Sequence, residues 1–166
     1  GNFYIYNGTT VHYLMRLNGY PVSEDEAAPL NSWADTYGLT GDAALPEADD
    51  DADGMPLLLE FIFGADPTGF DSADDFTDLG DSSGSALLAL DPSLGLDSAK
   101  QYVTFTVRVL RERGDVAIEA QASTDLNFSN PTPTAETQQV GDPVADGDYD
   151  IITYVATPAV EDLPSA

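Results

Sequence analysis

The most constraining feature of this chain is a long stretch without positive charge: residues 17–99 contain no lysine or arginine. Over the whole chain, 30 acidic side chains stand against 5 basic ones, which leaves a formal net charge of −25. Such a stretch cannot neutralise its carboxylates with salt bridges, so folding requires bound metal ions, high ionic strength or wide spacing of the carboxylates in water. The plain alternative is a secreted protein from a salty habitat, whose charge serves solubility alone.

The same charge limits the partners of the protein. A polyanion repels phosphate backbones and anionic lipid surfaces, so we expect no nucleic acid partner and no membrane insertion. The absence of cysteine excludes a disulfide scaffold, a thiolate zinc site and a cysteine nucleophile. The chain begins at Gly1 and shows no signal-peptide run or spanning segment. We therefore expect a mature exported protein, extracellular or on the cell surface.

The N-terminal region, residues 1–22, predicts a β-hairpin. Two β-prone runs, 3–6 and 9–17, flank Asn7-Gly8, which is typical of a type I′ turn. The segment 18–21, which contains glycine and proline, predicts the end of the second strand.

The next region, residues 23–100, predicts two short helices among acidic loops. Ser23 and Glu26 form a capping box that would open the first helix, and Gly38 would end it. The apolar run 57–63 predicts the second helix. A further apolar patch at 86–90 predicts a strand.

The last region, residues 101–166, predicts β-structure. Residues 102–109 alternate between apolar and polar, and with 116–122 they predict a second hairpin. Weaker strands are expected around 137–140 and 149–157. With 42% hydrophobic residues the chain can bury one core. We expect a mainly β fold, an antiparallel sandwich-like sheet with one or two short helices.

One segment, from Asp49 to Glu60, carries a pattern with a chemical meaning. Counted from Asp49, carboxylates occupy positions 1, 3, 5 and 12, and glycine occupies position 6. A Ca²⁺ ion takes about six to eight oxygen ligands, and this spacing wraps them around it. Leu57 at position 9 offers no side-chain oxygen, so water or another segment must replace it. The alternative is a solvated run of aspartates. We expect bound Ca²⁺, with these ligands: Asp49, Asp51, Asp53, the carbonyl of Met55, and Glu60.

The surroundings of this loop resemble a known segment. The loop, with the residues from Trp33 to Ala44 before it and Phe63-Gly64-Ala65-Asp66-Pro67 after it, resembles the calcium-loop segment found near the C-termini of large exported proteins of Verrucomicrobia and their relatives. The loop also resembles single dockerin or thrombospondin type 3 repeats. Residues 102–109 and 118–126 resemble the β-region that follows in those proteins. The resemblance implies bound calcium, and it transfers no catalytic activity to this chain.

Weaker candidates lie outside the loop. Two further acidic clusters resemble incomplete ion sites, with exposed loops as the alternative: Asp71, Asp74, Asp75 and Asp78, and residues 146–150. Asn7 and Asn127 each fit an N-glycosylation sequon. The single histidine, His12, has no serine or cysteine motif beside it, and nothing supplies a matched base, nucleophile or oxyanion hole. We therefore expect no enzymatic activity.

Two functions fit these features. The first is a structural subunit of an extracellular filament or surface assembly, a homo-polymer stabilised by calcium. Neighbouring subunits would be joined by exchange of the N-terminal strand. The alternative is that the N-terminal hairpin packs on its own chain. The second is a calcium-stabilised module of a larger secreted protein, which binds a glycan or a protein partner through tyrosine-rich strands: Tyr4, Tyr6, Tyr13 and Tyr102.

Overall fold

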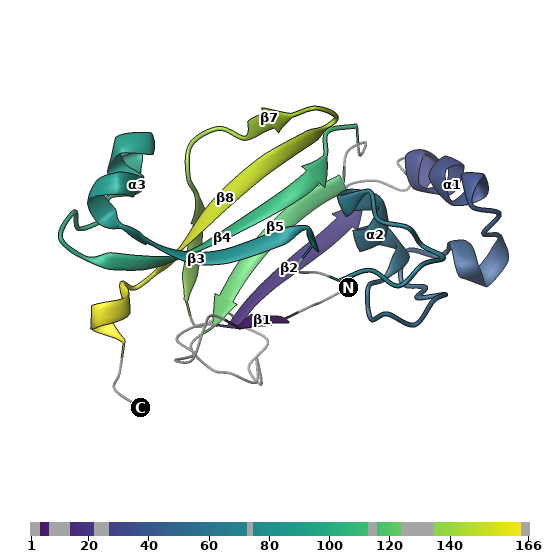
Figure 1. Ribbon diagram of the computed structural model, residues 1–166, viewed down its shortest axis with the longest axis horizontal. Coiled ribbons are helices and arrows are strands. Elements are labelled where there is room, and N and C mark those ends of the chain that lie inside the picture. The colour runs from purple at the N-terminus through teal and green to yellow at the C-terminus, as the bar shows by residue number, and fades with distance from the viewer. Residues whose placement is uncertain are drawn as a thin grey trace.

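Strand β4 (Gln101–Leu110) organises the fold, because its alternating sequence gives it one fully buried face, made by Val103, Phe105, Val107 and Val109. It pairs antiparallel with β3 (Thr77–Ser83) on one side and with β8 (Tyr149–Thr157) on the other. Strand β8 also pairs with β6 (Glu136–Gln139) and β7 (Val144–Asp146), which completes a sheet of five strands (Figure 1).

A second sheet contains three antiparallel strands in the order β1 (Tyr4–Tyr6), β2 (Leu14–Pro21) and β5 (Val116–Ser123). It meets the larger sheet at an isolated bridge between Ala122 and Ala135, just before β6. The computed structural model describes residues 4–6, 14–21, 27–72, 75–112, 116–123 and 135–163.

In the described part of the chain, three short α-helices flank the sheets. Helix α2 (Leu57–Phe63) is buried at every residue and packs against β4 and β2. Helix α1 (Ala27–Thr36) lies beside α2, whereas α3 (Gly84–Leu90) lies at the opposite end of the molecule (Figure 1). Single 3₁₀ turns occupy η2 (Gly41–Ala44), η4 (Pro92–Leu94) and η5 (Val160–Asp162). Within the described ranges, none of the helices has the length and apolar character needed to cross a membrane.

The hydrophobic core has two parts. The larger part joins apolar side chains of α1, α2, β4, β5 and β8. The smaller part lies under α3, on the other face of the larger sheet, and contains Leu87, Leu94, Tyr102 and Val155. The antiparallel, β-rich fold predicted from the sequence is confirmed, and the described residues form three α-helices where one or two were expected.

The N-terminal strands pair antiparallel, as predicted, but in a different register. Tyr6 pairs with Leu14, whereas a two-residue turn at Asn7-Gly8 would place Tyr6 opposite Thr9. That turn assignment is therefore wrong, and residues 7–13 lie outside the described part. The end of the second strand predicted at 18–21 is also wrong. Strand β2 continues through Pro21 and pairs with β5 over its full length. The capping box of Ser23 and Glu26 lies outside the described residues as well.

The predicted second hairpin is wrong, because its two strands belong to different sheets: β4 pairs with β3 and β8, whereas β5 pairs with β2. The strand expected at 86–90 is instead part of helix α3, where the Ser83 hydroxyl accepts a hydrogen bond from the Ala86 N–H. The polar segment that forms β3 carries no strand signal, yet all seven of its residues pair with β4.

Candidate metal centre

The acidic loop that starts at Asp49 leads directly into helix α2, and both of its ends are held together by the backbone. The Leu57 N–H donates to the carbonyl of Ala48 at 2.7 Å, and the Leu58 N–H donates to the carbonyl of Pro46 at 3.0 Å. The helix itself ends at Gly64, whose φ of 68° provides a left-handed cap. The predicted second helix is thus confirmed, and it fixes the loop against the core.

The interior of the loop is tightly bent. Gly54 has a φ of 93°, a conformation that glycine adopts without steric cost. Its N–H donates to Oδ2 of Asp49 at 3.1 Å, which ties the sixth position of the loop to the first. Ala52 also has a positive φ, of 60°. This curvature lets side chains at alternate positions face a common space.

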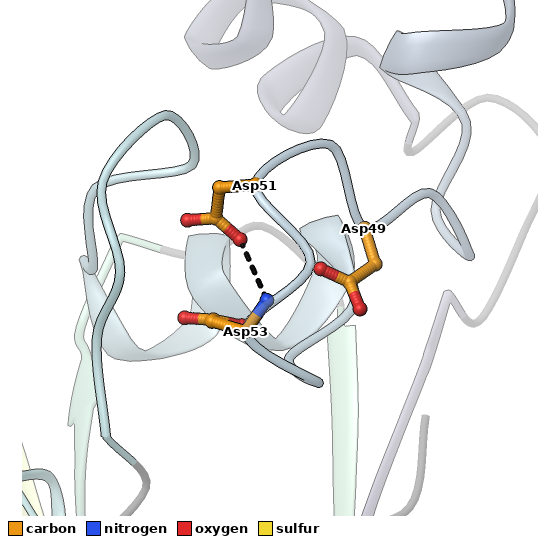
Figure 2. A group of neighbouring side chains, drawn as sticks. All are labelled: Asp49, Asp51 and Asp53. Atoms are coloured by element: carbon orange, nitrogen blue, oxygen red, sulfur yellow. Dashed lines mark hydrogen bonds between the residues drawn. The ribbon is translucent and has the colours of Figure 1, made fainter.

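Asp49, Asp51 and Asp53 form a carboxylate cluster, in which one oxygen from each lies within 4.8 Å of the others. All three side chains come from the one loop (Figure 2). The Asp53 N–H donates to Oδ1 of Asp51 at 3.1 Å, and the Met55 N–H donates to Oδ1 of Asp53 at 2.7 Å. These bonds orient the side chains. The cluster, which the sequence spacing predicted, is able to hold a metal ion.

Glu60 at the twelfth position is buried beside this cluster in α2, with only 1% of its surface exposed. It does not belong to the group of oxygens within 4.8 Å of one another. Its Oε1 atom and Oδ2 of Asp51 are buried and have no hydrogen-bond donor in the described part of the chain. Leaving such an atom unpaired costs about 1–3 kcal/mol, more when it is charged. A cation bound at the cluster would supply a partner to Asp51 and offset the buried negative charge of Glu60, so the residues fit a bound metal ion.

The electrostatics of the site favour a cation or a proton. Burial raises the pKa of Glu60 to about 8 from 4.5, and the neighbouring charges of Asp51, Asp53, Asp49 and Asp71 raise it in the same direction. Burial also raises the pKa of Asp51; the hydrogen bond from the Asp53 N–H opposes this effect, and the charges of Asp53 and Asp49 reinforce it.

None of the ion pairs among the described side chains involves a carboxylate of this loop. The ion pairs there are Lys100–Asp162 at 2.7 Å, Arg108–Asp146 at 3.6 Å and Arg111–Asp150 at 3.0 Å. All three join a residue on β4 or beside it to the C-terminal segment. Two carboxylates of the cluster at 146–150 are therefore paired with arginine rather than gathered around an ion.

Asp71 approaches the loop from elsewhere in the sequence. Its N–H donates to Oδ2 of Asp53 at 2.9 Å, and its own Oδ2 accepts from the Asp66 N–H at 2.8 Å. The sequence placed Asp71 in a separate acidic cluster. That cluster forms no ligand group among the described residues, and Asp74 lies outside them. No local signal marks the association of Asp71 with the loop, because it depends on the path of residues 64–71.

The two apolar positions of the loop have a structural role. Met55 and Leu57 are both buried in the main core. Leu57 starts α2, which explains why the ninth position carries a hydrocarbon side chain where a calcium loop often has an oxygen.

The tyrosine strip expected from the sequence is wrong at Tyr102, which is buried and whose hydroxyl accepts from the Asp97 N–H at 2.9 Å. Tyr4 and Tyr6 lie in β1, and Tyr13 lies outside the described residues. His12, Asn7 and Asn127 also lie outside them.

Comparison of the chain with protein-family models, with curated proteins and with solved structures finds no match. Its function is therefore inferred from its own residues and their geometry.

Proposed function

We propose that this protein is a calcium-stabilised, non-enzymatic structural module of an extracellular assembly. The observation that carries the proposal is Glu60, a buried carboxylate with an unpartnered oxygen beside the clustered Asp49, Asp51 and Asp53. An acidic cluster by itself is common on a protein surface. A buried carboxylate at the closing position of the same loop is costly, and a bound cation removes that cost.

The donor set favours calcium over other ions. All the side-chain donors are carboxylates, and the loop has no histidine or cysteine, which disfavours zinc and copper. Magnesium demands near-ideal octahedral geometry and keeps several waters, whereas calcium accepts more oxygens in a flexible arrangement. Affinities on the order of 10⁻⁴–10⁻³ M are typical of extracellular calcium modules, so a loop with an apolar ninth position is adequate there.

The place of the loop in the fold suggests what the ion does. Glu60 lies on α2, and α2 packs against β4 of the larger sheet and β2 of the smaller one. An ion that binds Glu60 and the loop would hold α2 against both sheets. Without the ion, carboxylate repulsion acts inside the core. Calcium would thus stabilise a rigid building block.

The proposal predicts that calcium raises the melting temperature of the purified chain. At a free concentration about 100 times Kd, the ion adds about 2.7 kcal/mol, or about 5–10 °C for a domain of this size. The measurement is thermal unfolding with excess chelator and with increasing calcium. Asp51→Asn should abolish most of the increase, whereas Asp142→Asn, at an exposed site, should preserve it. Equal melting temperatures with chelator and with calcium would refute the proposal.

Assembly by strand exchange can be tested separately. In the structure, β2 pairs with β5 of the same chain, with Asn18 opposite Glu119. Opposite residues in antiparallel strands lie about 4.5–5.5 Å apart at Cα, within the range of a disulfide. We expect the double variant Asn18→Cys, Glu119→Cys to form a disulfide within one chain, a clean readout because the protein has no other cysteine. A ladder of covalent oligomers on a non-reducing gel would instead show exchange between subunits.

A further inference from the structure

A cleft of about 410 Å³ lies between the helices and one end of the larger sheet. Its walls come from α1, α2, the end of β4 with the two residues after it, and the turn between β7 and β8: Trp33, Phe61, Leu110, Arg111, Glu112 and Asp148. Figure 1 shows this end of β4 and β8 on the side of the molecule where α1 and α2 lie. The volume is in the range of pockets that bind small molecules, about 300–1,000 Å³.

One wall of the cleft is aromatic and held in place. The Trp33 ring centroid lies 5.5 Å from that of Phe61 and 5.1 Å from that of Tyr37, with tilted ring planes. Phe61 is buried in the main core, and Trp33 is half-buried. Aromatic faces carry partial negative charge and pack well against C–H groups. This wall therefore suits the apolar face of a ring-shaped ligand.

Apart from Leu110, the rest of the lining is polar and includes both donors and acceptors. The Arg111 guanidinium donates through Nε to Oδ1 of Asp150 at 3.0 Å and through Nη2 to the carbonyl of Tyr149 at 2.9 Å. These two bonds orient the group and use two of its five N–H donors. Glu112 and Asp148 are exposed carboxylates, which only accept hydrogen bonds.

The charges of the walls narrow the ligand class. A net charge of −25 repels an anionic ligand at long range. A cationic ammonium ligand could pair with Glu112 and Asp148, but it has no acceptor for the N–H donors of Arg111. A hydroxyl group is both donor and acceptor, so an uncharged polyol matches a guanidinium beside two carboxylates. We propose that this cleft binds a neutral saccharide, with one sugar face against Trp33 and its hydroxyls toward Arg111, Glu112 and Asp148.

The proposed site goes beyond the structural role of the calcium loop and differs in place from the predicted tyrosine strip. Because Phe61 directly follows Glu60 on α2, the ion and the cleft share one helix. Saccharide binding is therefore measured in saturating calcium. The melting temperature of the same protein sample is recorded, because it reports whether the calcium-stabilised fold is intact. Loss of saccharide binding at an unchanged melting temperature then separates a failure of this site from a failure of the calcium proposal.

The test uses Trp33, which is the single tryptophan of the chain, so its fluorescence reports directly on the cleft. The probes are neutral hexaoses from cellulose, xylan, mannan, starch and chitin. We expect a saturable fluorescence change with at least one of them, and the same affinity by calorimetry. Glu112→Gln and Asp148→Asn should each weaken binding about tenfold, as expected for one hydrogen bond to a charged group. The control Asp142→Asn should leave the affinity unchanged.

Three results would overturn the proposal. The first is that no hexaose binds at millimolar concentration. The second is that binding persists at full strength in Glu112→Gln and Asp148→Asn, which would place it outside the cleft. The third is that a lysine-rich peptide perturbs Trp33 in a salt-sensitive way while the saccharides do not, which would make the cleft a site for basic segments.

Discussion

Glu60→Gln is expected to change stability in opposite directions with and without calcium. In metal-free protein at pH above about 8, the variant should be more stable than the wild type, because it removes a buried negative charge beside Asp51, Asp53 and Asp49. In saturating calcium it should be less stable, because it removes the carboxylate that we propose closes the shell around the ion.

The pH dependence has a defined direction. Burial in the folded, metal-free protein raises the pKa of Glu60 to about 8, whereas the ordinary pKa of a glutamate side chain, taken for the unfolded state, is 4.5. Well below pH 4.5 the group is protonated in both states and contributes nothing to the pH dependence of unfolding. Between these values the folded state holds the extra proton, so the free energy of unfolding falls as pH rises. The loss is on the order of a few kcal/mol, since one pKa unit corresponds to about 1.4 kcal/mol.

The measurement is urea unfolding of wild type and Glu60→Gln across this pH range, in chelator and in calcium. The matched control is Glu47→Gln, at an exposed carboxylate just before the loop. The control should follow the wild type in both conditions. A Glu60→Gln variant that is destabilised equally in chelator and in calcium would mean that the side chain serves packing alone.

Gly84→Ala should be strongly destabilising, although it lies far from the acidic loop. A Cβ atom at Gly84 would overlap the carbonyl oxygen of Asp97 and approach its carbonyl carbon at 2.8 Å. The backbone there is held by the Gly84 N–H, which donates to the carbonyl of Lys100 at 2.8 Å, and by the Ser85 N–H, which donates to the carbonyl of Ser98 at 3.2 Å. Because these atoms are backbone, they cannot rotate away. We expect a loss of about 1–3 kcal/mol or more.

The matched control for this prediction is Gly80→Ala in β3, where the nearest atom to an added Cβ is Oγ1 of Thr104 at an ordinary 3.5 Å. Alanine at that site should leave stability within about 1 kcal/mol of wild type, since it restricts the unfolded chain and meets no obstacle. Chemical unfolding of both variants gives the comparison. Equal stabilities would show that α3 does not approach the segment at Asp97 as closely as the structure indicates.

Local patterns in the sequence were sufficient for much of this protein. The acidic spacing from Asp49 to Glu60 predicted the cluster, the apolar run before Gly64 predicted α2, and alternation predicted β4 and β5. Each of these depends on a few consecutive residues: a turn that needs glycine, a capped helix, a strand with two different faces. These local interactions do not depend on contacts with distant segments of the chain.

Tertiary structure alone decided which of these elements meet. Strands β4 and β5 follow each other in the chain but separate into two sheets, and polar β3 becomes a strand only because β4 offers it an edge. The short apolar run of α3 was ambiguous between strand and helix. The burial of Glu60, the approach of Asp71 and the cleft beside Trp33 likewise require distant segments to pack. Pairing and burial are non-local: their free energy depends on contacts that no window of the sequence contains.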